Sequence, residues 1–222
     1  APTGTINILL YINADLKKEA MASALVSCAE AKAAAMQELL ISSRYSCGIA
    51  TGTGTDGVII IANAESNTHL TNAGKHSKLG ELIGRTVITS IKEALRLQQG
   101  ITTHSQHDII RRMERFGVSE DALWDCYKET YRNLIRAEFT EILDHIRTED
   151  RLVTYSSLYA HLLDQLSWGL LSFAECRIAA RDLLKLADLH PNPDCGSENI
   201  VQNYILAIAE RIYRESVRPK QK

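Results

Sequence analysis

The chain has 222 residues, of which 45% are hydrophobic and 23% are charged. This composition is typical of a globular protein and excludes a disordered chain. The 25 basic and 27 acidic side chains leave a formal net charge of −2, which does not indicate nucleic acid as a partner. The sequence also lacks a run of about 18 apolar residues, so we expect no membrane-spanning segment.

The five cysteines are scattered along the chain, and no two have the C-x-x-C spacing of a zinc site. Dispersed thiols in an odd number indicate a reducing compartment rather than a disulfide framework. The sequence opens at Ala1 with Ala-Pro-Thr-Gly and shows no signal peptide, and whether Ala1 is the natural start stays open. We therefore expect a cytoplasmic protein without a membrane partner.

The first elements are a strand and a long helix. Residues 5–13 form a β-branched, nearly continuous apolar run, which predicts a strand covered on both faces. Helical spacing and many alanines predict a helix over 15–41, with Asn13 and Asp15 as capping side chains. The apolar positions of this helix are Met21, Leu25, Cys28, Ala31, Ala35, Met36 and Leu39.

A second strand and a second long helix complete the first hundred residues. The sequence GVIIIAN at 57–63 predicts the strand. Helical spacing returns over 79–99, and Gly100 is a natural stop.

Beyond Gly100 the sequence predicts helices alone. Helical patterns occur at 104–115, 120–147, 152–167, 172–188 and 198–216, with helix starts at Ser119 and at Ser197-Glu198. A hydrophobic stripe of Trp124, Tyr127, Tyr131, Leu134, Ile135 and Ile142 should form the core, closed by Tyr155, Tyr159 and Trp168. The predicted fold is an α/β (α+β) unit over 1–100, with a short sheet and two long helices, followed by an all-helical unit over 101–222.

The first candidate motif is ATGTGTDG at 50–57, which leads directly into the second strand. Its glycines allow close approach of the backbone, and the Thr53 and Thr55 hydroxyls, Gly54 and Asp56 could orient a polar substrate or hold a water. The motif lacks the Gly-Lys-Ser/Thr end of a phosphate-binding loop, and its glycines precede a strand, unlike those of a dinucleotide site. A tight turn with structural glycines also explains it.

The second motif is NAGKHSKLGELIG at 72–84, just before the second long helix. His76 can move protons near neutral pH, and Lys75 or backbone N–H groups beside Gly74 could stabilise an oxyanion. Alternatively, His76 caps the helix and Glu81 complements its dipole.

Charged groups on helices offer two weaker candidates. Glu30 and Lys32 on the first helix are two residues apart, so they do not face each other, and one could point into a site. His104 and His107, followed by Asp108, have a spacing that could suit zinc, but zinc needs at least a third ligand. A solvated helix start explains the histidines better, and no metal site is predicted.

In this order the motifs resemble the adenosylcobinamide amidohydrolase family (CbiZ type). The resemblance is carried by Gly-Thr-Ile-Asn at 4–7, Ala-Glu-Ala-Lys-Ala at 29–33, ATGTGTDG at 50–57 and AGKHSKLGELIG at 73–84, and covers about residues 4–98. Members of this family usually have a further N-terminal portion before the first strand, which this sequence lacks. The resemblance thus covers the later part of the family domain.

The resemblance implies hydrolysis of the amide between aminopropanol and the corrin ring of adenosylcobinamide, which yields adenosylcobyric acid for cobamide salvage. The corrinoid is then the substrate, and no cofactor is required. From side-chain chemistry, the catalytic candidates are His76, Asp56, Lys75 and Glu30, with Asp56 or His76 as the general base toward water. The substrate-binding candidates are Thr53, Gly54, Thr55, Asn7, Gly74 and Glu81.

Two other functions stay open. The chain could be a non-catalytic corrinoid-binding or regulatory protein that retains the fold, or an unrelated helical interaction protein. The segment 101–222 could be a fused domain, an oligomerisation unit or a partner-binding module. As partners we expect the small corrinoid and no nucleic acid, together with a second copy of the chain or a chain that carries the absent N-terminal portion.

Overall fold

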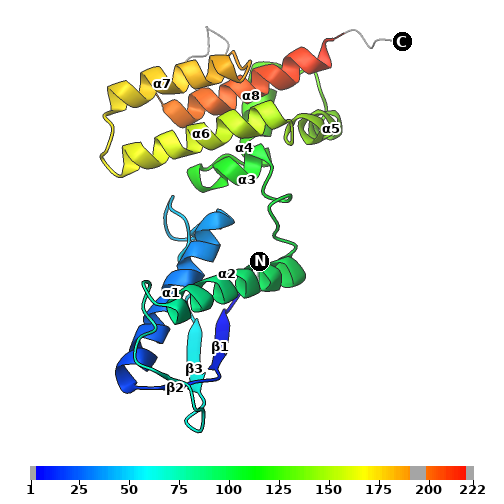
Figure 1. Cartoon of the computed structure of the whole chain (residues 1–222). Coiled ribbons are helices and arrows are strands. Elements are labelled where there is room, and N and C mark those ends of the chain that lie inside the picture. The colour runs from blue at the N-terminus through cyan, green and yellow to red at the C-terminus, as the bar shows by residue number, and fades with distance from the viewer. Residues whose placement is uncertain (1–3, 191–198, 219–222) are drawn as a thin grey trace. The chain divides into compact units, whose positions relative to one another are not determined.

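The computed structural model describes residues 4–190 and 199–218. The chain divides into two compact units, Ala1–Ser105 and Gln106–Lys222 (Figure 1). None of the described helices is both long enough and apolar enough to cross a membrane.

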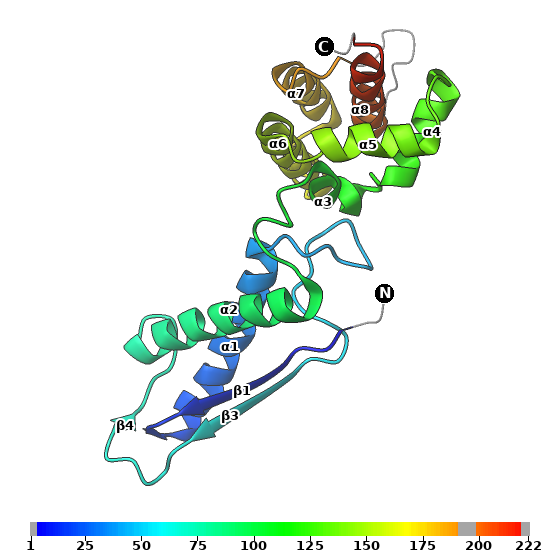
Figure 2. The ribbon, with the colours of Figure 1, turned by 90° about the vertical axis from the view of Figure 1, so that its right-hand side faces the viewer.

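The first unit contains two long helices and two short parallel sheets. Its elements are β1 (Asn7–Ile12), β2 (Asp15–Leu16), α1 (Lys18–Glu38), β3 (Gly57–Ala62), β4 (His69–Leu70) and α2 (Lys78–Gln99). β1 pairs with β3 in parallel from Asn7↔Gly57 to Ile12↔Ala62, and β2 pairs with β4. α1 packs against β3 and α2, and Figure 2 shows both helices on the same side of the two longer strands. The predicted fold class is confirmed for this unit.

The core of the first unit is built on the small side chains of α1. Ala20, Ala24, Cys28, Ala31 and Ala35 are buried, as predicted for Cys28 and the two later alanines. The predicted core position Leu25 is exposed instead. An alanine face lets α2 approach closely, and α2 fills the contact with larger side chains, namely Ile83, Val87, Ile91 and Leu95.

The prediction that the first strand is covered on both faces is wrong for the described residues. Leu10 and Ile12 point into the core, whereas Leu9 and Tyr11 are exposed. Side chains alternate between the faces of a strand, and both helices lie on one side, so every second residue of β1 has no cover.

The start of α1 also differs from the prediction. The helix begins at Lys18, and its N-cap residue Lys17 makes no side-chain capping bond. Asn13 and Asp15 are used elsewhere: Asn13 accepts a hydrogen bond from the Asn63 amide, and Asp15 pairs with His69. At the other end of the unit the predicted stop of α2 is confirmed, since Gly100 adopts a left-handed conformation with φ of 66°.

The described part of the second unit is helical throughout. Its elements are α3 (Ile109–Met113), the 3₁₀ helix η1 (Glu114–Phe116), α4 (Glu120–Thr130), α5 (Arg136–Ile146), α6 (Asp150–Ser167), α7 (Phe173–Leu186) and α8 (Ile200–Ser216). Ser119 caps α4 as predicted, and Asn199 caps α8. The predicted helix start at Ser197-Glu198 lies outside the described residues.

Three predictions for the second unit need correction. The helix expected over 120–147 is broken between α4 and α5, where Arg132 has a φ of 57°. The helix expected over 104–115 is limited to α3 and η1. Tyr127 and Tyr159 lie in the core as predicted, but Ile135 and Trp168 are exposed, because Ile135 sits in the break and Trp168 ends α6.

Candidate functional site

Asp56 organises the first glycine motif at the N-terminal edge of the β1–β3 pair. Its Oδ1 accepts hydrogen bonds from the Ile6 backbone N–H, at 3.1 Å, and from the Thr53 hydroxyl. Its Oδ2 accepts from the Thr53 backbone N–H at 2.8 Å. The carboxylate therefore ties the 50–57 loop to the residue that precedes β1.

Lys32 from α1 completes this arrangement. Its Nζ lies 2.5 Å from Asp56 Oδ2, and the two side chains are only 14% and 9% exposed. Burial opposes the negative charge of Asp56, but the hydrogen bonds from Lys32, Thr53 and Ile6 outweigh it and hold the pKa of the carboxyl below its usual range. From the sequence, Lys32 was a charge that could point into a site, but no catalytic or binding role was predicted for it. The available signal was a lysine between alanines of the helix, where a charge close to the core needs a partner.

Close packing explains two of the three glycines of this loop, Gly52 and Gly57. A Cβ on Gly52 would lie 2.3 Å from Asp56 Oδ2, and one on Gly57 would lie 2.8 Å from Asn7 Oδ1. Gly54 has open space around its Cβ position. The Thr55 hydroxyl is hydrogen-bonded to that of Thr5 at 2.6 Å.

The second glycine motif is held by hydrogen bonds to α1 and to the start of α2. The Ser77 hydroxyl accepts from the Gly80 N–H at 3.0 Å, as an N-cap does, and donates to the Gly74 carbonyl at 2.8 Å. From α1, the buried Ser27 hydroxyl donates to the Ala73 carbonyl at 2.9 Å. A Cβ on Gly80 would lie 2.1 Å from the Gly74 carbonyl oxygen, so only glycine permits this contact.

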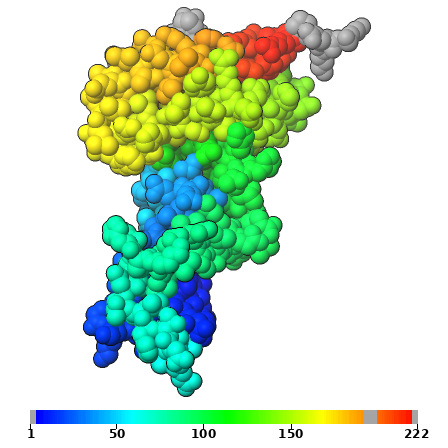
Figure 3. Space-filling view, viewed as in Figure 1, coloured from blue at the N-terminus to red at the C-terminus, as the bar shows by residue number. Residues whose placement is uncertain are grey.

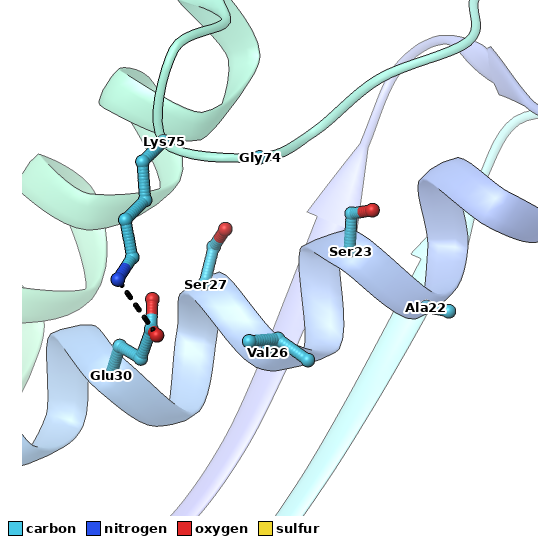
Figure 4. A pocket seen from close by; sticks show the side chains of 7 residues that line it. All are labelled: Ala22, Ser23, Val26, Ser27, Glu30, Gly74 and Lys75. Atoms are coloured by element: carbon cyan, nitrogen blue, oxygen red, sulfur yellow. Dashed lines mark ion pairs between the residues drawn. The ribbon is translucent and has the colours of Figure 1, made fainter.

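An open pocket of about 330 Å³ lies between α1 and this loop, lined by Ala22, Ser23, Val26, Ser27, Glu30, Gly74 and Lys75 (Figure 4). The Lys75 Nζ is 2.9 Å from Glu30 Oε1 across it. The neighbouring His76 is exposed and, within the described chain, has no hydrogen-bond partner. The pocket is thus lined by a cation and a carboxylate, and His76, which follows Lys75 in the chain, is not among its lining residues.

Glu81, from the same motif, does not line the pocket. Its carboxylate accepts a hydrogen bond from Lys78 at 2.7 Å and lies 3.6 Å from Arg85. The hydrogen bond from Lys78 and the charges of Lys78 and Arg85 hold the pKa of Glu81 below its usual range. These contacts agree with the alternative interpretation of Glu81 as a helix-terminal charge.

The two glycine motifs therefore meet different parts of α1. Glu30 reaches the second motif and Lys32 reaches the first, which agrees with the prediction that the two charges do not face each other. The pocket lining includes three predicted site residues, Glu30, Gly74 and Lys75. Asp56, Thr53, Gly54, Thr55 and Asn7 are at the edge of the sheet and do not line it.

Polar residues at the carboxyl ends of β1 and β3 were not predicted as site residues. Asp15 Oδ2 lies 2.8 Å from His69 Nδ1, and the Asn63 amide donates to Asn13 Oδ1 at 2.8 Å. The rule that ligands bind at the carboxyl ends of parallel strands was the available signal. In the space-filling view the segment after β3 forms one end of the first unit (Figure 3).

Of the two histidines considered as metal ligands, His107 is engaged in another contact. His107 Nε2 lies 3.0 Å from Asp150 Oδ1, and Asp108 caps α3 and pairs with Arg147 at 2.6 Å. Over residues 4–190 and 199–218, no three His, Cys, Asp or Glu side chains are grouped as a metal site requires.

Comparisons with known proteins agree with the resemblance seen in the sequence. Residues 1–103 match the family model described as adenosylcobinamide amidohydrolase. An uncharacterized protein of Methanocaldococcus jannaschii is 43% identical over 99 residues, which are 44% of this chain and 38% of that protein. The chain therefore spans well under half the length of this relative. No solved structure matches the chain. The predicted resemblance of the first hundred residues to this family is confirmed, and residues 104–222 lie outside the match.

Proposed function

We propose that the first unit, which carries this partial match, hydrolyses the amide that joins aminopropanol to the corrin ring of adenosylcobinamide. The products would be adenosylcobyric acid and the free amino alcohol. The observation that carries the proposal is that residues 1–103 match the amidohydrolase family and include all four motifs. Contacts of Glu30 and Lys32 on α1 join both glycine motifs to one helix, which further supports it.

The pocket beside Lys75 is where we place the reacting amide. An exposed ion pair contributes only about 0–1 kcal/mol, so the amide oxygen can replace Glu30 as the partner of Lys75 at small cost. The Lys75 cation would then stabilise the negative charge that develops on this oxygen. The pocket volume is near the lower limit of about 300 Å³ for small-molecule sites. We therefore propose that only the aminopropanol amide side chain of the corrinoid enters the pocket, and that the corrin ring stays outside.

We assign the general base to His76 rather than to Asp56. Both Asp56 oxygens accept hydrogen bonds, and its pKa is lowered, so the carboxylate is a poor acceptor for a proton from water. Asp56 would instead position the 50–57 loop. His76 would take a proton from water as its oxygen bonds to the amide carbon. The imidazolium would return the proton to the leaving nitrogen as the C–N bond breaks.

The test is incubation of the full chain with adenosylcobinamide, followed by mass spectrometry of the products. We expect adenosylcobyric acid, at a rate that EDTA does not change. His76→Ala should reduce the rate about 100-fold or more, the usual contribution of a general base. The matched control is His104→Ala, because His104 is an exposed histidine of the same unit outside the motifs.

The result also separates catalysis from the corrinoid-binding alternative. A change in the visible spectrum of the corrinoid without product would support a binding or regulatory protein and reject the hydrolase. Full activity of His76→Ala would reject the assignment of the base while leaving the reaction in place.

A further inference from the structure

Four large apolar side chains cover the side of the β1–β3 pair that faces away from α1. Leu9, Tyr11, Ile59 and Ile61 are 69%, 61%, 56% and 42% exposed. Leu9 is the register partner of Ile59, and Tyr11 is the register partner of Ile61. Because directly opposite side chains on one face are neighbours, these four residues form one continuous apolar patch, which we call the outer face.

The outer face is unusual for a sheet of this kind. Parallel sheets occur almost only where both faces are covered, and their strands are apolar on both sides for that reason. The described strands β1 and β3 pair only with each other, so each also has a free edge with unpaired backbone groups. Such edges and apolar faces are where a further polypeptide pairs with a sheet. The surface therefore has both the apolar area and the backbone groups that a covering segment needs.

The relative from M. jannaschii supplies a candidate for this segment. The part similar to this chain is 38% of that protein, so more than half of the relative is additional polypeptide on the same chain. Covalent linkage holds that polypeptide at high effective concentration near the equivalent strands. We propose that the outer face is the docking surface for a polypeptide equivalent to the part of the relative outside the 99 matched residues. The docked segment adds to the sheet and covers Leu9, Tyr11, Ile59 and Ile61.

The test is co-expression of the full chain with the separately encoded remainder of the M. jannaschii relative. Light scattering after size exclusion should give the mass of a one-to-one complex. Hydrogen exchange should slow at residues 7–12 and 57–62 in this complex. The readout is assembly, so it does not depend on whether the proposed hydrolysis occurs.

Substitutions on the outer face should abolish the complex without unfolding the chain. Leu9→Asp with Ile59→Asp places two charges in the docking surface and should weaken binding at least 100-fold. If the double aspartate variant lowers the stability of the chain, Ile59→Thr replaces it as the test of binding, because threonine keeps a β-branched side chain suited to a strand. Leu97→Asp is the matched control, because Leu97 is 70% exposed on α2 of the same unit, and it should leave binding unchanged.

Two results would overturn the proposal. One is a homodimer of this chain that Ile59→Thr disrupts, which would assign the outer face to a second copy. The other is a chain that stays monomeric in the presence of the remainder of the relative, with no change in exchange at β1 and β3.

Discussion

At the residue scale, the buried ion pair of Lys32 and Asp56 holds the first glycine motif in place. Lys32 lies on a helix and Asp56 in a loop, more than 20 residues apart in the sequence. The Asp56 carboxylate also accepts hydrogen bonds from the backbone N–H groups of Thr53 and Ile6. Removal of one partner of a buried pair leaves the other charge without compensation, which costs much more than the pair contributes by itself.

Replacement of Asp56 by asparagine should therefore lower the stability of the first unit and change its pH dependence. At pH 7 we expect a loss of about 3 kcal/mol in the free energy of unfolding, since buried Lys32 loses its partner. The folded pKa of Asp56 is depressed, so its contribution is complete above the unfolded pKa of about 3.9 and is lost as the pH falls through the folded pKa. The difference between the two proteins should shrink over that range.

Native-state hydrogen exchange of α1 and α2 measures this difference. Glu93→Gln is the control, because Glu93 is exposed and pairs with Arg96 within α2, so its loss should have little effect. Equal stability of Asp56→Asn and the wild-type protein at pH 7 would contradict a structural role for Asp56.

At the scale of elements, the start of α2 depends on a backbone contact. Gly80 lies against Gly74, and Ser77 bonds to both residues, so the first turn of the helix and the preceding loop form one rigid structure. The loop carries Gly74, Lys75 and His76, so the packing of Gly80 sets the position of the proposed catalytic groups.

Two glycines of α2 give a matched pair of substitutions. Gly80→Ala would place a Cβ 2.1 Å from the Gly74 oxygen, and the resulting overpacking should cost about 1–3 kcal/mol of stability. Gly84→Ala meets nothing within 4 Å, so it should stabilise the helix by roughly 0.5–1 kcal/mol.

Urea unfolding of the two variants provides the comparison, with hydrolysis assayed in parallel. We expect Gly80→Ala alone to impair hydrolysis. A Gly80→Ala protein as stable and as active as Gly84→Ala would show that the contact between the loop and the helix is not needed.

At the scale of the whole molecule, each unit has a core of its own. The first core contains α1, α2 and the inner side of β1–β3, and the second lies among α3 to α8. In the second unit the buried pair of Arg115 and Asp164 joins η1 to α6, and the Tyr159 hydroxyl donates to the Ile200 carbonyl at 2.6 Å. These contacts lie entirely within residues 106–222.

We expect residues 106–222 to fold when expressed alone. The fragment keeps a complete core, and a chain of this size buries enough surface for independent stability. Both tryptophans of the protein, Trp124 and Trp168, belong to this unit, so their fluorescence follows its unfolding selectively. A cooperative urea transition with helical circular dichroism is the expected result, and a gradual transition would contradict it.

The sequence by itself determined the two longer strands and two long helices of the first unit, the helical character of the described second unit, and the order of the motifs. Periodicity and glycines are local properties, so the two longer strands, the two long helices and the stop at Gly100 could be predicted. Local signals could not show the break at Arg132, where the backbone enters a left-handed conformation.

Only the tertiary structure decided which side chains meet. Glu30 and Lys32 have similar sequence surroundings, yet one reaches Lys75 and the other Asp56, because partners are chosen by contacts between distant segments. The same holds for β1: its apolar pattern predicts cover on two faces, but the position of both helices on one side leaves Leu9 and Tyr11 exposed. Burial depends on what packs against a strand, and the sequence of the strand alone does not contain that information.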